Sequence, residues 1–106
     1  MAERKIDIKI MSDIQKFLNE VSKSYTIDAV YIFGSYAKGT IHKWSDVDVA
    51  IISKDVKNRI DDLVNMLMIA DQYEAYIEPH PFNTEDFNPE ENFLVGEILR
   101  TGIRVA

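Results

Sequence analysis

Gly34-Ser35-Tyr36-Ala37-Lys38-Gly39, followed after a short gap by Ser45-Asp46-Val47-Asp48, is the stretch of sequence that decides the fold of this chain. An apolar run, Ala29–Phe33, ends at its first glycine, and another, Val47–Ile52, follows its aspartates. Runs of β-branched and aromatic residues next to glycine are typical of buried strands. The stretch therefore predicts a strand, a tight turn with a short helix from Ser35 to Gly39, a loop over residues 40–45, and a second strand.

The segments on either side of this stretch show helical or strand periodicity. Apolar residues at helical spacing predict one amphipathic helix before it, through Ile10, Ile14, Phe17, Leu18 and Val21, and a second from Lys57 to Tyr73, through Ile60, Leu63, Val64, Leu67 and Ala70. Side chains alternate from Glu74 to Phe82, which predicts a strand, and its prolines favour a sheet edge or a strand end.

The C-terminal segment carries the signals of one more helix. Asn88 is the expected N-cap, Pro89 the first helical residue, and Gly102 the stop. The apolar stripe of this helix is expected to contain Phe93, Leu94, Ile98 and Leu99, and a short strand could follow at residues 103–105. The whole order predicts an α/β (α+β) fold, a small mixed β-sheet packed with helices, in a single domain over residues 1–106.

Composition narrows the class of protein. The chain has 106 residues, 46% of them apolar and 28% charged, with a net charge of −6 and no cysteine. No apolar run approaches membrane-spanning length, and the charged start predicts no secretory signal, so we expect a cytoplasmic protein. Without cysteine there is neither a disulfide framework nor a thiolate metal site. Because lysine and arginine are scattered, tight binding of nucleic acid is unlikely on charge grounds.

Three acidic residues are the candidate metal ligands. Asp46 and Asp48 lie two residues apart on a predicted strand and therefore share a face. Two close carboxylates repel each other, and a divalent cation such as Mg²⁺, which prefers oxygen ligands and substrate phosphates, removes the conflict. Glu78, on the polar face of the strand after the second long helix, is the candidate third ligand. At the turn, backbone N–H groups of Gly34 and Ser35 are placed to bind phosphate, with Lys38 adding positive charge.

The pattern G-S-x-A-x-G-x5-S-D-x-D resembles the nucleotidyltransferase superfamily of the DNA polymerase β type, and most of all its minimal members, the MNT domains. The residues that carry the resemblance are Gly34, Ser35, Gly39, Ser45, Asp46 and Asp48, with Glu78 as a weaker match. The resemblance implies the polymerase β-like palm fold, with Asp46, Asp48 and Glu78 as catalytic metal ligands. It also places Gly34, Ser35, Lys38 and Ser45 at the nucleotide.

The resemblance further implies a function. Such enzymes transfer a nucleoside monophosphate with Mg²⁺, two ions being possible, and small MNT proteins are often antitoxins. We therefore expect transfer of AMP from ATP to a hydroxyl of a helical HEPN-type partner protein. Many relatives have arginine where this chain has Lys38, and the third acid is often aspartate rather than Glu78. Larger members carry an extra helical domain for the second substrate, for which this chain has no room.

Other interpretations of the same residues stay open at this point. Ser45 and Asp48 also match a helix-capping box, which would make the acids structural. Glu78 alone could be a solvated strand residue, and His80 is expected to be a surface histidine. A non-catalytic module that binds a nucleotide or a partner is the alternative function. Modification of a small molecule has less support, because such relatives need more chain to bind the acceptor.

Overall fold

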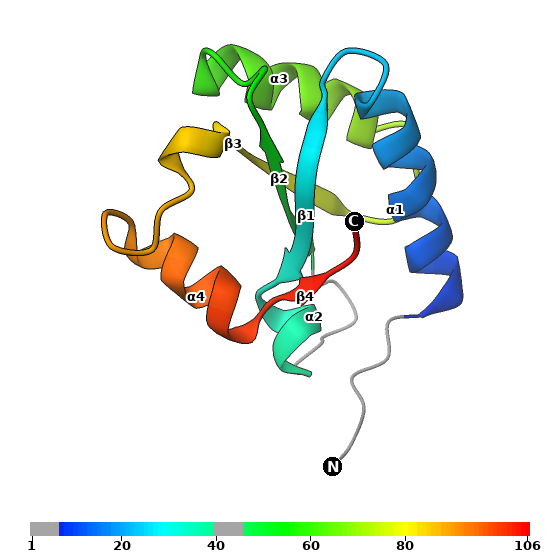
Figure 1. Cartoon of the computed structure of the whole chain (residues 1–106). Coiled ribbons are helices and arrows are strands. Elements are labelled where there is room, and N and C mark those ends of the chain that lie inside the picture. The colour runs from blue at the N-terminus through cyan, green and yellow to red at the C-terminus, as the bar shows by residue number, and fades with distance from the viewer. Residues whose placement is uncertain (1–6, 40–45) are drawn as a thin grey trace.

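The computed structural model describes residues 7–39 and 46–106, and these form a four-stranded mixed sheet with helices on both faces (Figure 1). The expected α/β class is therefore confirmed. The loop expected over residues 40–45, which includes Ser45, lies outside the described residues. The elements are α1 (Ile8–Val21), β1 (Ile27–Phe33), α2 (Ser35–Lys38), β2 (Val47–Ser53), α3 (Arg59–Ala70), β3 (Ile77–Phe82), the 3₁₀ helix η1 (Thr84–Asp86), α4 (Phe93–Thr101) and β4 (Ile103–Arg104).

The strand order is β3-β2-β1-β4. β1 pairs with β2 and β4 in antiparallel fashion, whereas β2 and β3 are parallel and are joined through α3. β3 is thus an edge strand, as the prolines at positions 79 and 81 predicted, because proline cannot donate to a central ladder. Since parallel strands run the same way, the first residues of β2 and β3 meet at one end of the sheet.

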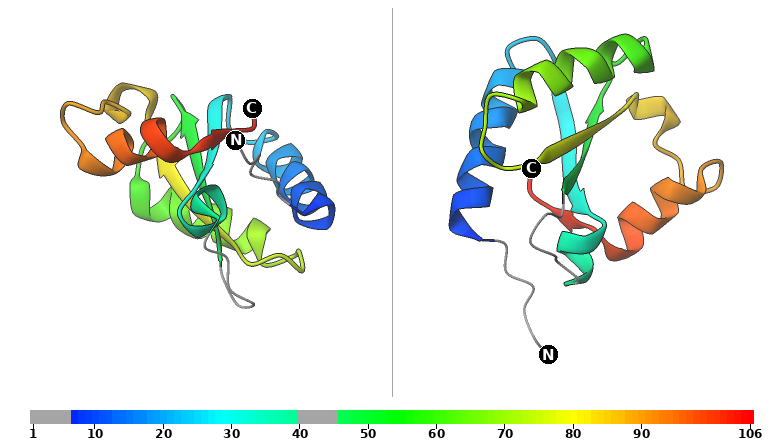
Figure 2. Two further views of the ribbon diagram at one scale, coloured as in Figure 1. Left: turned by 90° about the horizontal axis from the view of Figure 1, so that it is seen from below. Right: turned by 180° about the vertical axis from the view of Figure 1, so that it is seen from behind.

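Two apolar clusters hold helices to the two faces of this sheet. On one face, α1 and α3 cover alternate residues of the strands. On the other face, α4 packs through Val95 and Ile98 against Phe33, Ala50 and Ile52. Figure 2 shows α1 and α4 on opposite sides of the strands. The apolar residues that pack with α4 do not include Asp48 or Glu78, near the start of β2 and β3, so polar side chains occupy that end of the face.

Side-chain caps explain where the long helices begin. Asp7 accepts a hydrogen bond from the backbone of Lys9 at the start of α1, and Asn58 does the same for two N–H groups of α3. Asp62, in the first turn of α3, accepts from the backbone of Lys57 and from the hydroxyl of Tyr25. Within the described residues, no helix has both the length and the apolar character that crossing a membrane requires.

The predicted start of the last helix is wrong. Asn88 and Pro89 form a separate turn in which the backbone N–H of Asn92 donates to the carbonyl of Asn88. The backbone of Asn92 is extended, and its side chain caps α4 by accepting from the N–H groups of two residues in the first turn. Asparagine is a favourable N-cap at either position, but only the helix that follows Asn92 packs on the sheet, through the buried Val95. This helix ends before Gly102, as expected.

The spacing of apolar residues correctly predicted where α3 and α4 lie in the sequence. It did not correctly predict which of their apolar side chains are buried. In α3 the buried side chains are Met66 and Ala70, while Ile60, Val64 and Leu67 are exposed. In α4, Phe93 and Leu99 are exposed as well. Both helices contain more apolar positions than one face can bury. Contacts with the sheet, which the local pattern does not contain, therefore select the buried face.

Candidate active site

Asp48 and Glu78 are brought together by the parallel pairing of β2 and β3. They are direct partners in the register, so their side chains project from the same face of the sheet. That face is the one which α4 partly covers. Asp48 is largely buried, with 23% of its side chain exposed, and Glu78 is half exposed at 48%. The two predicted carboxylates therefore form a pair that solvent reaches from one side.

His80 completes a cluster with these two acids. Its Nε2 atom lies 3.1 Å from Oδ1 of Asp48 and 3.7 Å from Oε1 of Glu78. The imidazole ring packs edge-on against Phe33, with 4.9 Å between the ring centroids. Only 22% of the side chain is exposed. The sequence interpretation of His80 as a surface histidine is therefore wrong, because the ring leans back over the sheet toward Asp48.

Gly34 gives the carboxylate of Asp48 its space. The glycine follows the last residue of β1 and has φ 72° and ψ −145°, a conformation that is open almost only to glycine. A Cβ atom at this position would lie 2.3 Å from Oδ2 of Asp48. Two separate constraints therefore require glycine at position 34: the backbone conformation at the turn into α2, and the space that the carboxylate of Asp48 occupies.

Burial and neighbouring charges raise the pKa of Glu78 above its ordinary value. Partial burial is the largest cause, followed by repulsion from Asp48. Asp46 adds a smaller repulsion, whereas His80 acts in the opposite direction and lowers the pKa. The folded protein therefore holds a proton on Glu78 more tightly than the unfolded chain does, and ionising this carboxyl group costs folding free energy.

We expect Glu78→Gln to stabilise the metal-free protein at neutral pH. A group whose folded pKa is raised makes the protein lose stability as pH rises from its unfolded pKa, about 4.3 for glutamate, through its folded pKa. Wild type and variant should therefore be similarly stable below pH 4 and diverge above pH 5, by less than about 1 kcal/mol because Glu78 is half exposed. Urea unfolding in EDTA at several pH values measures the difference.

The control for this measurement is Glu91→Gln, which removes an exposed carboxylate from the turn before α4. It should leave stability within about 0.5 kcal/mol of wild type at every pH. A Glu78→Gln protein that loses stability relative to wild type as pH rises would contradict the placement of Glu78 beside Asp48.

Asp46 lies next to this cluster but is not one of its three members. It is exposed and directly precedes β2, so the strand alternation that was expected to place it on the face of Asp48 does not include it. Together with Glu78 it lines a surface pocket of about 260 Å³, whose other wall contains Leu67, Asp71 and Tyr76. Asp46 is thus placed at the open rim of the site, within electrostatic reach of Glu78.

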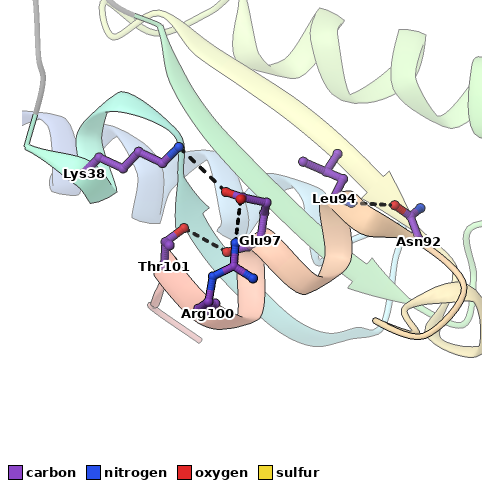
Figure 3. A network of polar contacts seen from close by, with 6 residues as sticks. All are labelled: Lys38, Asn92, Leu94, Glu97, Arg100 and Thr101. Atoms are coloured by element: carbon purple, nitrogen blue, oxygen red, sulfur yellow. Dashed lines mark hydrogen bonds and ion pairs between the residues drawn. The ribbon is translucent and has the colours of Figure 1, made fainter.

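Two further predicted site residues lie on α2, whereas Ser45 lies outside the described residues. Ser35 is the first residue of α2, and the helix ends at Gly39, as expected. Lys38 extends from α2 toward α4, where its ammonium group lies 3.7 Å from Oε2 of Glu97 (Figure 3). Glu97 also pairs with Arg100 at 2.6 Å. The structure thus gives Lys38 a partner on α4, which the sequence analysis did not anticipate.

The residues present fit a divalent cation. Asp48, Glu78 and His80 each offer one ligand atom, and these atoms all lie within 4.8 Å of one another. Repulsion from Asp48 is, after burial, the second cause of the raised pKa of Glu78. A cation bound at this point would remove that repulsion. Asp46 is not among the residues whose ligand atoms lie this close together.

Three curated proteins resemble parts of the chain. A protein provisionally named protein adenylyltransferase from Methanocaldococcus jannaschii is 38% identical over 53% of this chain and 41% of its own length. A second one from that organism is 33% identical over 62% of this chain and 65% of its own length. Protein adenylyltransferase MntA of Shewanella oneidensis is 41% identical over 32% of this chain and 24% of its own length. The matches thus span less than two thirds of each relative.

The comparisons with solved structures and with a family model cover nearly the whole chain. A chain from a crystal structure of a mutant toxin–antitoxin pair, MntA–HpeT, superposes on 96% of this chain and 73% of its own, with a TM-score of 0.64 and 18% identity. A provisionally assigned nucleotidyltransferase from Sulfolobus solfataricus covers 97% of this chain and 90% of its own, with a TM-score of 0.53 and 22% identity. At these identities the likeness concerns the fold. Since the model of the nucleotidyltransferase domain matches residues 14–104, which include the Asp48–Glu78 pair, the chain belongs to the nucleotidyltransferase domain family.

Proposed function

We propose that this chain is a Mg²⁺-dependent nucleotidyltransferase that transfers AMP from ATP to a hydroxyl group of a partner protein. The observation that carries the proposal is the pairing of Asp48 with Glu78 beside the gap that Gly34 leaves. The names of the relatives, two of them provisional, support a protein as the acceptor. A bound Mg²⁺ would neutralise charge on the phosphates and orient the α-phosphate.

The side chains have separate roles in this proposal. Asp48, on β2, and Asp46, directly before this strand, are proposed to hold the cation, with Glu78 of β3 as the third acid. The acceptor oxygen forms a bond to the α-phosphorus, the bond to the bridging oxygen of the β-phosphate breaks, and pyrophosphate leaves. In this proposal Glu78 serves either as the third ligand of the cation or as the base that takes the proton of the hydroxyl group.

The nucleotide is proposed to bind at the turn into α2. The N–H groups after Gly34 and the hydroxyl of Ser35 would contact the phosphates, and Ser45 is proposed to contact them from the segment before β2. Lys38 would reach the triphosphate by exchanging Glu97 for a phosphate, a change that its exposed side chain permits. Glu97 would keep Arg100 as its partner after this exchange.

We further propose that the acceptor is a helical HEPN-type toxin and that this chain is its antitoxin. The fold is shared with a chain from a toxin–antitoxin structure. The described residues also leave large apolar side chains exposed on α3, among them Ile60 and Met68, as a protein that binds a partner would. The same exposure favours the second candidate, a module that binds a partner or a nucleotide without turnover.

Label transfer separates the two candidates. Wild type and the Asp46→Asn/Asp48→Asn protein are incubated with α-phosphate-labelled ATP, Mg²⁺ and an extract of the source cells. One labelled protein that appears only with wild type would establish the transferase and identify its acceptor by mass. If neither protein gives a band with any of the four nucleotides, while both bind the same partner, the binding module is the correct interpretation.

A further inference from the structure

We propose that His80 is a direct ligand of the cation, so that the site formed by Asp48, Glu78 and His80 binds a first-row transition ion such as Mn²⁺ in preference to Mg²⁺. The inference rests on the proposed function, since it concerns the metal of the same site, and it replaces Mg²⁺ there with an ion that also accepts a nitrogen ligand. It differs from the ligand set predicted by sequence, which contained carboxylates alone.

The distances within the cluster suit one ion. Cis ligands of an octahedral ion with bonds of about 2.1 Å lie about 3 Å apart. The Nε2 atom of His80 lies 3.1 Å from one carboxylate oxygen and 3.7 Å from the other, and all three ligand atoms lie within 4.8 Å of one another. The same nitrogen therefore faces both carboxylates, as a ligand of a shared ion would.

The fold holds the imidazole in this position. His80 pairs with Ala50 in the register of β2 and β3, and the small buried side chain of Ala50 lets the ring lean toward Asp48. Phe33 packs against the imidazole ring with an edge-on contact. Glu78 and His80 each precede a proline, which restricts both to extended backbone conformations. Their side chains therefore start from a fixed geometry on one face before any ion binds.

The donor set decides which ion is preferred. Mg²⁺ favours oxygen ligands and loses its water reluctantly, so an imidazole nitrogen adds little to its binding. First-row transition ions accept both imidazole and carboxylate ligands, and among them Mn²⁺ is the one best suited to carboxylates. A nitrogen between two carboxylates therefore shifts the selectivity of the site toward Mn²⁺.

Electron paramagnetic resonance tests the ligand directly. The full chain is titrated with Mn²⁺, and pulsed measurements of electron spin-echo modulation record whether a ¹⁴N nucleus is coupled to the bound ion. Wild type should show this coupling. His80→Phe, which keeps an aromatic ring against Phe33, should lose it, whereas variation of the second histidine, His42→Ala, should not. Wild-type protein without nitrogen coupling, or loss of the coupling in His42→Ala, would overturn the proposal.

Competition with Mg²⁺ gives an independent readout. The measured quantity is the ratio of Mg²⁺ to Mn²⁺ concentration at which half of the bound Mn²⁺ is displaced. This ratio should be lower than in wild type by about tenfold or more in His80→Phe, and also in His80→Asn, which keeps a polar side chain near Asp48. Equal losses of affinity for both ions would mean that His80 only orients Asp48, and would overturn the proposal. Circular dichroism checks that both variants fold.

The proposed function fails in a different way. Metal binding is measured without nucleotide or partner, so nitrogen coupling without any label transfer would count against the transferase alone. If the protein transfers label but its preference for Mn²⁺ does not depend on His80, only the proposal that His80 is a metal ligand would be contradicted.

Discussion

Replacing Asp48 with asparagine is expected to reduce nucleotidyl transfer by about 10³-fold or more, because a metal-held transition state loses several kcal/mol of stabilisation and each 1.36 kcal/mol is a factor of ten. The carboxylate of Asp48 lies close to Glu78 and His80, and it has space because Gly34 carries no Cβ atom that would clash with it. An amide of the same size keeps the packing but lacks the negative charge that binds the cation.

The same substitution should not destabilise the metal-free fold. Asp48 repels Glu78, and removal of its charge relieves that repulsion. Activity and stability should therefore respond differently, which separates a catalytic role from a structural one. The measurement is label transfer at saturating metal together with thermal unfolding in EDTA.

Asp61→Asn is the matched control for this substitution, because it removes the charge of an exposed aspartate on α3. It should leave both transfer and stability close to wild type. Full transfer by Asp48→Asn would refute the proposed mechanism, whereas loss of transfer together with unfolding would show that Asp48 is structural.

Gly34→Ala is expected to lower both stability and activity. The backbone at position 34 lies in a region that costs a side chain about 1–3 kcal/mol, which for a domain of this size corresponds to a fall in Tm of roughly 5–20 °C. The new methyl group would also displace Oδ2 of Asp48, which lies 2.3 Å from the ideal Cβ position. Misplacement of a reacting group by about 1 Å can reduce the rate by about 10²-fold.

Gly39 supplies the control that separates these two effects. It also has a positive φ, 75°, at the end of α2, but a Cβ there meets nothing within 4 Å. Gly39→Ala should therefore show backbone strain without displacement of the acid. If the two alanine variants lose activity equally at a temperature where both are folded, the contact between position 34 and Asp48 has no catalytic importance.

The sequence predicted the strands and helices well because each carries a local pattern. The runs at Ala29–Phe33 and Val47–Ile52 are buried strands, and the turn from Gly34 to Gly39 contains the expected short helix. The strand expected from Glu74 begins only at Ile77, since local alternation does not show where pairing with β2 starts. The choice between Asn88 and Asn92 as the cap of α4 also depended on tertiary packing.

The continuous motif supplied Asp48 and Gly34 as candidates, and side-chain alternation in the later strand supplied Glu78. Asp48 and Gly34 belong to one stretch, and they lie close together because Asp48 pairs with Phe33, the residue before Gly34, in the register of β1 and β2. The position of His80 depends on the register of two parallel strands, which neighbouring residues do not encode. Its spacing of two residues from Glu78 was the one signal that could have placed it on the same face. The pairing of Lys38 with Glu97 likewise required the packing of α2 beside α4.

The outer edge of β3 has a consequence for how an acceptor is recognised. The carbonyl of Tyr76 accepts from the backbone N–H of Val47 on β2, so by alternation the backbone groups of residues 77, 79 and 81 face outward. The N–H of Ile77 is bonded to the carbonyl of Ala75, and Pro79 and Pro81 have none. Between Ile77 and Pro81 this edge therefore has no donor left for strand addition. If the chain transfers a nucleotide to a partner protein as proposed, we expect the acceptor segment to approach the carboxylates as a helix or loop, recognised by its side chains and shape.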